Sequence, residues 1–129
     1  MQIKSFRDLR VWQAGIELAR LVYELTSRFP RSEIYGLASQ MQRAAVSIPS
    51  NIAEGPACES TKEYLQYLSI AQVSLAELET QLEIANQTKY ISPADTSIPL
   101  EKISSLGRQL FALSNALMNP KAKATSPGS

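Results

Sequence analysis

Histidine is absent from the 129 residues of this chain, and cysteine occurs once. Without histidine there is no imidazole base, no Ser-His or Cys-His pair and no histidine-bearing metal site. The lone Cys58 excludes an intrachain disulfide, which fits a reducing compartment. Enzyme chemistry would have to rely on carboxylates, lysine or tyrosine. We predict a protein that is not an enzyme and that uses no cofactor, metal or small-molecule substrate.

Long apolar runs are also missing. No stretch approaches the roughly 20 residues that span a bilayer, and the start of the chain, MQIKSFRDLR, lacks the hydrophobic segment of a secretory signal. We therefore expect a cytoplasmic protein without a membrane partner. The formal net charge is only +1, but residues 1–43 hold seven Lys or Arg against four acids, whereas residues 54–83 hold six Glu against one Lys. One part of the surface is predicted to be basic and another acidic.

Glycine is sparse, and segments rich in Ala, Leu, Glu, Gln and Arg alternate with short joints that contain proline, a composition that favours helices. Apolar residues recur every three or four positions in four segments, which predicts helices over about 6–28, 33–55, 60–90 and 93–118. The predicted N-caps are Ser5, Ser32, Ser60 and Ser92. We expect one domain over residues 1–119, followed by a disordered polar tail over 120–129.

Four amphipathic helices with short connections favour an all-α fold, an antiparallel up-down-up-down four-helix bundle. A long two-helix coiled coil is the structural alternative, although it leaves many apolar faces uncovered. Pro49 lies inside the second predicted helix, where it removes the hydrogen bond to the Ala45 carbonyl. We expect the helix to bend or restart near Pro49.

Two polar seams run beside the apolar stripes of the second and third predicted helices. The first seam is Gln40, Arg43, Ser47, Asn51 and Glu54, and the second is Ser60, Glu63, Tyr67, Ile70, Ser74, Glu77 and Gln81. The seams either meet a second protomer or are ordinary solvated flanks, and we favour the first reading because Tyr67 and Ile70 would otherwise be exposed apolar surface. The predicted oligomer interface comprises Gln40, Ser47, Pro49, Asn51, Glu54, Gly55, Tyr67, Ile70, Ser74 and Glu77.

A basic patch is predicted at one end of the first helix. Antiparallel threading brings Lys62, Lys121 and Lys123 toward Lys4, Arg7 and Arg10. Such cations bind phosphates without sequence preference, but nearby acids offset part of the charge, and a solvated charged end is an equal alternative. The candidate contacts to nucleic acid or an acidic partner are Lys4, Arg7, Arg10, Arg20 and Arg43. A catalytic role for Asn51 with Glu54 is disfavoured, because a single glutamate lacks a recognisable partner.

Three stretches, FRDLRVWQAG, FPRSEIYGLASQMQRAAVSIPSNIAEG and ESTKEYLQYLSIAQVSLAELETQLEIA, together resemble the four-helix bundle family of 23S ribosomal RNA intervening-sequence proteins. That family includes the accessory variability proteins of diversity-generating retroelements. The resemblance implies a ring-like homopentamer with no known enzymatic activity. In the retroelement members it implies a basic ring that binds nucleic acid and partners a reverse transcriptase.

Two departures from the family pattern remove positive charge. The family commonly has two arginines in its Gln-x-Arg-Arg-Ala block, whereas this chain has Gln42 before Arg43. An arginine also often follows the glycine of the NIAEG block, and this chain has Cys58 instead. The leading hypothesis is a ring-forming accessory protein that binds RNA or DNA, with a reverse transcriptase as a candidate partner. The rival hypothesis is a protein-only oligomeric scaffold of the intervening-sequence type.

Overall fold

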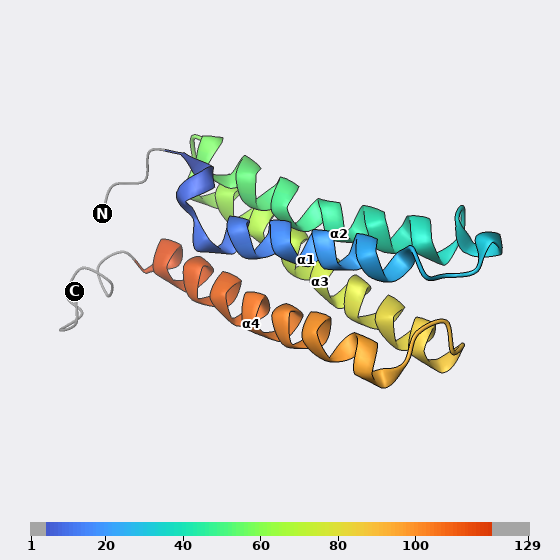
Figure 1. The fold of residues 1–129 in the computed structure, drawn as a ribbon. Coiled ribbons are helices and arrows are strands. Elements are labelled where there is room, and N and C mark those ends of the chain that lie inside the picture. The colour runs from blue at the N-terminus through green and yellow to red at the C-terminus, as the bar shows by residue number, and fades with distance from the viewer. Residues whose placement is uncertain (1–4, 120–129) are drawn as a thin grey trace.

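The computed structural model describes residues 5–119, so Lys4, Lys121, Lys123 and the predicted disordered tail lie outside the described residues. Four helices form the fold: α1 (Arg10–Thr26), α2 (Leu37–Glu54), α3 (Thr61–Gln87) and α4 (Pro93–Met118). Each helix lies beside the next in an antiparallel sense, and α4 returns beside α1, so that both described ends of the chain lie at one end of the bundle (Figure 1). The predicted all-α four-helix bundle is confirmed. Within residues 5–119, no helix is both long enough and apolar enough to cross a membrane.

The core is built from large aliphatic side chains that all four helices contribute. The largest fully buried ones are Leu18, Val22, Met41, Ile48, Ile52, Leu68, Leu78, Leu82, Leu106 and Leu110. Burying each such side chain is worth about 1.5 to 3 kcal/mol. The apolar stripes read from the sequence therefore converge on one shared core.

The first helix begins later than predicted. Residues Phe6–Asp8 form a short 3-10 helix, η1, in which the Ser5 Oγ accepts a hydrogen bond from the Arg7 N–H at 3.1 Å. Leu9 then has an extended backbone and a buried side chain, and α1 starts at Arg10. The break lets Phe6 fold back so that the Phe6 and Trp12 rings meet edge to face, with 5.3 Å between the ring centroids. Burial of Leu9 and this aromatic contact outweigh the continuity of one long helix.

The second helix also starts differently from the prediction. Ser32 caps no α-helix, because residues Arg31–Glu33 form a separate 3-10 turn, η2. Instead, the first backbone N–H of α2, that of Leu37, donates a hydrogen bond to Glu33 Oε1 at 2.9 Å. Pro49 lies within an unbroken α2, so the helix does not restart there, and a third short 3-10 helix, η3 (Gly55–Ala57), follows its end.

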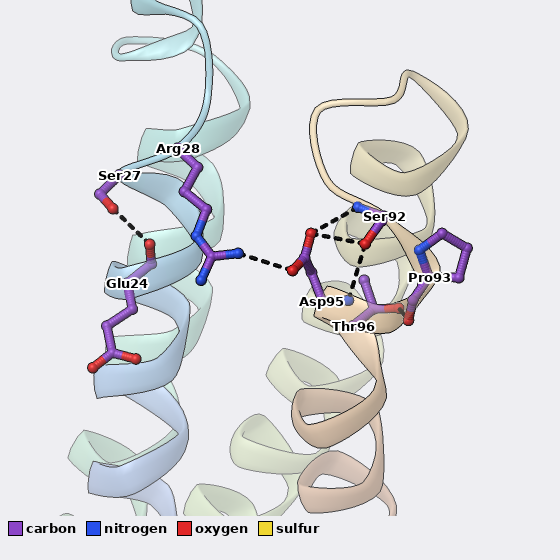
Figure 2. Close-up of polar contacts among 7 residues, drawn as sticks. All are labelled: Glu24, Ser27, Arg28, Ser92, Pro93, Asp95 and Thr96. Carbon is purple, nitrogen blue, oxygen red and sulfur yellow. Dashed lines mark hydrogen bonds and ion pairs between the residues drawn. The ribbon is translucent and has the colours of Figure 1, made fainter.

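The edge between α1 and α4 is closed by ion pairs. Arg28 Nη1 lies 2.8 Å from Asp95 Oδ1, and Lys102 Nζ lies 3.1 Å from Glu17 Oε1. Ser92 is the N-cap of α4 as predicted, and Asp95 completes a capping box with it (Figure 2). The Ser92 backbone N–H is the main cause that lowers the pKa of the Asp95 carboxyl below its ordinary value, with smaller contributions from the Ser92 hydroxyl and Arg28. One carboxylate thus both starts α4 and ties it to α1.

Candidate functional site

The two polar seams predicted from the sequence face each other within one chain, at the contact between α2 and α3. The Ser74 Oγ donates to the Ser47 Oγ at 2.9 Å. The Asn51 Nδ2 donates both to the Ser47 carbonyl oxygen at 2.7 Å and to the Ser47 Oγ at 3.0 Å. Ser74 is only 5% exposed. The centre of the SIPSNIAEG block therefore joins two helices of the same bundle.

A polar groove lies on the outer side of this contact. This α2–α3 groove has a volume of about 410 Å³ and is lined by Gln40, Arg43, Ala44, Ser47, Ser74 and Glu77. Arg43 and Glu77 line it, but neither takes part in the three ion pairs found among residues 5–119. Arg43 instead donates to the Ser39 Oγ at 3.1 Å. Glu77 is the one carboxylate among the residues that line this groove, which therefore lacks the second carboxylate needed for acid-base chemistry.

Two other residues of the predicted interface have roles inside the chain. Pro49 is buried, and an ideal Cβ on Gly15 would lie 3.2 Å from its Cβ, so glycine allows α1 to approach α2 closely. Gly55 is covered by Tyr64, whose ring would lie 2.6 Å from an added Cβ. Contacts within one chain therefore explain why glycine occupies positions 15 and 55, without a second protomer.

The remaining predicted interface residues are wholly or partly exposed to solvent. Gln40, Glu54, Ile70 and Glu77 are exposed, and Tyr67 is half-buried. Asn51 is bonded to Ser47 rather than placed as a catalytic partner of Glu54. Contact with a second protomer through this part of the surface stays a prediction.

Among the predicted cations that the structure describes, Arg7 and Arg10 lie apart from Arg20 and Arg43. Arg7 and Arg10 lie close together at the end of the bundle that carries η1, and the guanidinium carbon of Arg7 lies 6.0 Å from the Phe6 ring centroid and 5.5 Å from that of Trp12. A hydrogen bond of 2.9 Å from Gln13 Nε2 to the Arg7 carbonyl oxygen fixes this turn. Cation–π contacts of this kind orient an exposed guanidinium without neutralising it.

Arg20 and Arg43 lie elsewhere. Arg20 pairs with Glu24 at 2.7 Å on the surface of α1, whereas Arg43 lines the α2–α3 groove. The sequence pattern could not separate them, because their places around the bundle depend on which neighbour each helix meets.

A feature that the sequence analysis missed is a larger groove between α3 and α4. This α3–α4 groove has a volume of about 1,180 Å³ and is lined largely by apolar and small side chains, among them Leu65, Ala76, Leu100, Gly107, Phe111 and Met118. Phe111, at its rim, is 64% exposed. A signal was present, since Leu100, Phe111 and Met118 fall outside the buried stripe of α4. Apolar residues beside a core stripe mark a second contact surface.

No metal site accompanies these grooves in the part of the chain that the structure describes. Residues 5–119 contain no group of three or more Cys, Asp or Glu side chains that could hold an ion. Cys58 is a free thiol, and burial is the main cause that raises its pKa, with a smaller effect from Glu63 and Glu54. A raised pKa lowers the reactive thiolate fraction, so Cys58 is not poised as a nucleophile.

Comparison with known proteins places this architecture among related chains. The family model of the 23S rRNA-intervening sequence protein matches residues 7–112. A solved structure, a protein of unknown function from the S23 ribosomal protein family of Bacteroides thetaiotaomicron, has a TM-score of 0.75 at 22% identity and covers 81% of this chain and 97% of its own. That likeness shows a shared fold. No curated protein matches the chain significantly.

Proposed function

Because the chain belongs to the family of 23S rRNA-intervening sequence proteins, we propose that it is a non-enzymatic, homo-oligomeric accessory protein that binds nucleic acid. The proposed assembly is a cytoplasmic homopentameric ring. A reverse transcriptase of a diversity-generating retroelement is the proposed protein partner, on the strength of the sequence resemblance to the accessory proteins of such elements.

The observation that carries the nucleic-acid proposal is the bundle end formed by η1 and the start of α1. Arg7 is held over two aromatic rings, and Arg10 follows one turn later with an exposed side chain. Oriented guanidinium groups suit phosphate oxygens, because they present several donors in a fixed plane. A ring repeats this end in every protomer, so that individually weak contacts to one nucleic-acid strand act together.

Two observations favour a second candidate, a protein-only scaffold. The full chain has a net charge of only +1, and Arg20 is already paired with Glu24. In this reading Arg7 and Arg10 keep a charged end soluble, and the protein acts only through its protomer contacts.

Binding to structured RNA and to duplex DNA across a salt series separates the two candidates. We expect the affinity to fall by at least about 100-fold between roughly 50 and 200 mM salt, because bound phosphates release counterions. The double variant Arg7→Glu, Arg10→Glu should weaken binding tenfold or more. Arg31→Glu is the matched control, since Arg31 is exposed at the opposite end of the bundle.

Absence of binding at low salt would overturn the nucleic-acid proposal and leave the scaffold. If the Arg31→Glu control loses as much binding affinity as the double variant, only the net charge of the protein matters for binding. That outcome would rule out η1 as the nucleic-acid site. Light scattering tests the ring separately: a monomer at high micromolar concentration contradicts it. Copurification with a reverse transcriptase encoded beside the gene tests the proposed protein partner, and failure to copurify removes that partner alone.

A further inference from the structure

Two aromatic rings and one guanidinium group meet at the surface of the bundle end that carries η1. The Phe6 and Trp12 rings lie edge to face, and the Arg7 guanidinium carbon lies over both, 6.0 Å from the Phe6 centroid and 5.5 Å from the Trp12 centroid. Both rings are half-buried, whereas Arg7 is exposed. We call this cluster of Phe6, Arg7 and Trp12 the Arg7 platform.

The backbone of Arg7 is held in place on both sides. Its N–H donates to the Ser5 Oγ at 3.1 Å, and its carbonyl oxygen accepts from the Gln13 Nε2 at 2.9 Å. Leu9, two residues later, is buried in the core and anchors the end of the turn. A segment that is already ordered loses less conformational entropy when a ligand binds to it. The Arg7 platform is therefore preorganised.

The polar groups of the Arg7 side chain are not used within the described part of the chain. Arg7 takes part in none of the three ion pairs found among residues 5–119, and its hydrogen bonds there are made by its backbone. A guanidinium group offers a flat face and several N–H donors in one plane. The rings hold this group in position and leave it available to a ligand.

Charge alone gives this end of the bundle little attraction for phosphate. Helices α1 and α3 begin here and α2 ends here (Figure 1). Among residues 5–119, the charged side chains at this end are Arg7, Arg10, Lys62, Asp8, Glu54, Glu59 and Glu63. The carboxylates offset the cations, so a contact that does not depend on net charge adds affinity that phosphate attraction does not supply.

Stacking of a base is such a contact. Every nucleobase has a flat face that stacks on aromatic rings and on guanidinium planes. We infer that the Arg7 platform stacks an unpaired nucleobase, so that the nucleic acid is bound through a single-stranded segment; the inference rests on the proposed function. Inside a duplex, the neighbouring base pairs cover both faces of each base, and an unpaired base is the one that can reach the platform.

A strand without bases separates stacking from phosphate attraction. We compare the binding of a short single-stranded oligonucleotide with that of an abasic strand of the same length, which carries the same phosphates. The intact strand should bind about tenfold more tightly or better, because stacking of even one base contributes that much. Trp12 is the only tryptophan in the chain, so its fluorescence at saturation should change with the intact strand and stay unchanged with the abasic strand.

Two variants that keep the charge assign the effect to the Arg7 platform. Arg7→Lys retains the cation but removes the planar group. It should abolish the preference for the intact strand and leave the affinity for the abasic strand within about twofold of the wild type. Arg10→Lys is the matched control, since Arg10 is also exposed at this end, and it should retain the preference. Circular dichroism checks that both variants fold.

Equal binding of the intact and abasic strands would overturn the stacking inference while nucleic-acid binding stands. An undiminished preference in Arg7→Lys would also overturn it, because the Arg7 guanidinium would then serve only to stabilise η1. Equal loss of the preference in Arg10→Lys would place the stacking elsewhere and contradict the Arg7 platform. If neither strand binds at low salt, the proposed nucleic-acid function falls together with this inference.

Discussion

At the scale of single residues, the hydrogen bonds around Ser47 give the SIPSNIAEG block its structural role. Asn51 and Ser74 both donate to Ser47, one from the next turn of α2 and one from α3. The sequence correctly placed these polar side chains beside a core stripe. It could not show that the two seams meet in one chain, because helical periodicity fixes a face but not the neighbour of that face.

Substitution of Asn51 tests this role. Asn51→Asp removes both Nδ2 donors and places a carboxylate beside the Ser47 carbonyl oxygen, so we expect the free energy of unfolding to fall by about 1 to 3 kcal/mol. Urea unfolding measures this change. Ser50→Asp adds the same charge one residue earlier on an exposed side chain and should stay within about 0.5 kcal/mol of the wild type. Equal effects of the two variants would contradict the assigned hydrogen bonds.

At the scale of the helices, close approach and capping decide where each element lies and begins. Gly15 lets α1 contact α2 at Pro49, whereas Gly107 leaves room between α3 and α4. The sequence predicted the N-cap of α4, Ser92, correctly. It failed at the starts of α1 and α2, because the Phe6 ring contact and the Glu33 carboxylate that accepts from the Leu37 N–H involve residues other than the predicted N-caps.

The two glycines give opposite results on replacement with alanine. Gly107→Ala should raise the free energy of unfolding by about 0.5 to 1 kcal/mol, since its Cβ finds free space and the helix gains propensity. Gly15→Ala should lower it by about 1 kcal/mol, because Pro49 is rigid and overpacking costs more than the propensity gain. Thermal and urea unfolding of both variants measures the difference. A stabilised Gly15→Ala would show that α1 can move away from Pro49 at little cost.

At the scale of the whole molecule, the two ends of the bundle differ in their electrostatics. The end distant from η1 carries Glu33, which accepts hydrogen bonds from the Leu37 N–H and, at 2.8 Å, from the Tyr90 hydroxyl. The Leu37 N–H is the main cause that lowers the pKa of Glu33 below its ordinary value of 4.5, and Tyr90 adds to it. Asp95, whose pKa is also lowered, ties α4 to α1 at the same end.

Acid should therefore loosen this end first. A carboxyl whose pKa is lowered by folding stabilises the protein above its unfolded pKa, and that stability is lost as the pH falls through its folded value. As the pH falls below the ordinary carboxyl pKa values of 4.5 for Glu33 and 3.8 for Asp95, hydrogen-exchange protection should fall earlier near Leu37 and Thr96 than near Leu68. Glu33→Gln should remove part of the pH dependence of urea unfolding, whereas Glu101→Gln, at an exposed position on α4, should leave it unchanged. Uniform loss of protection along the bundle would contradict this order.

The sequence by itself determined the number of helices, their apolar stripes and the bundle class, because helical periodicity and short connections are local properties. It also carried the motif that identifies the family. Only the tertiary structure decided which polar seams are covered within the chain, which arginines lie together and where an open apolar groove remains. These depend on the rotation of each helix against its neighbours, which is set by side-chain packing across the whole core.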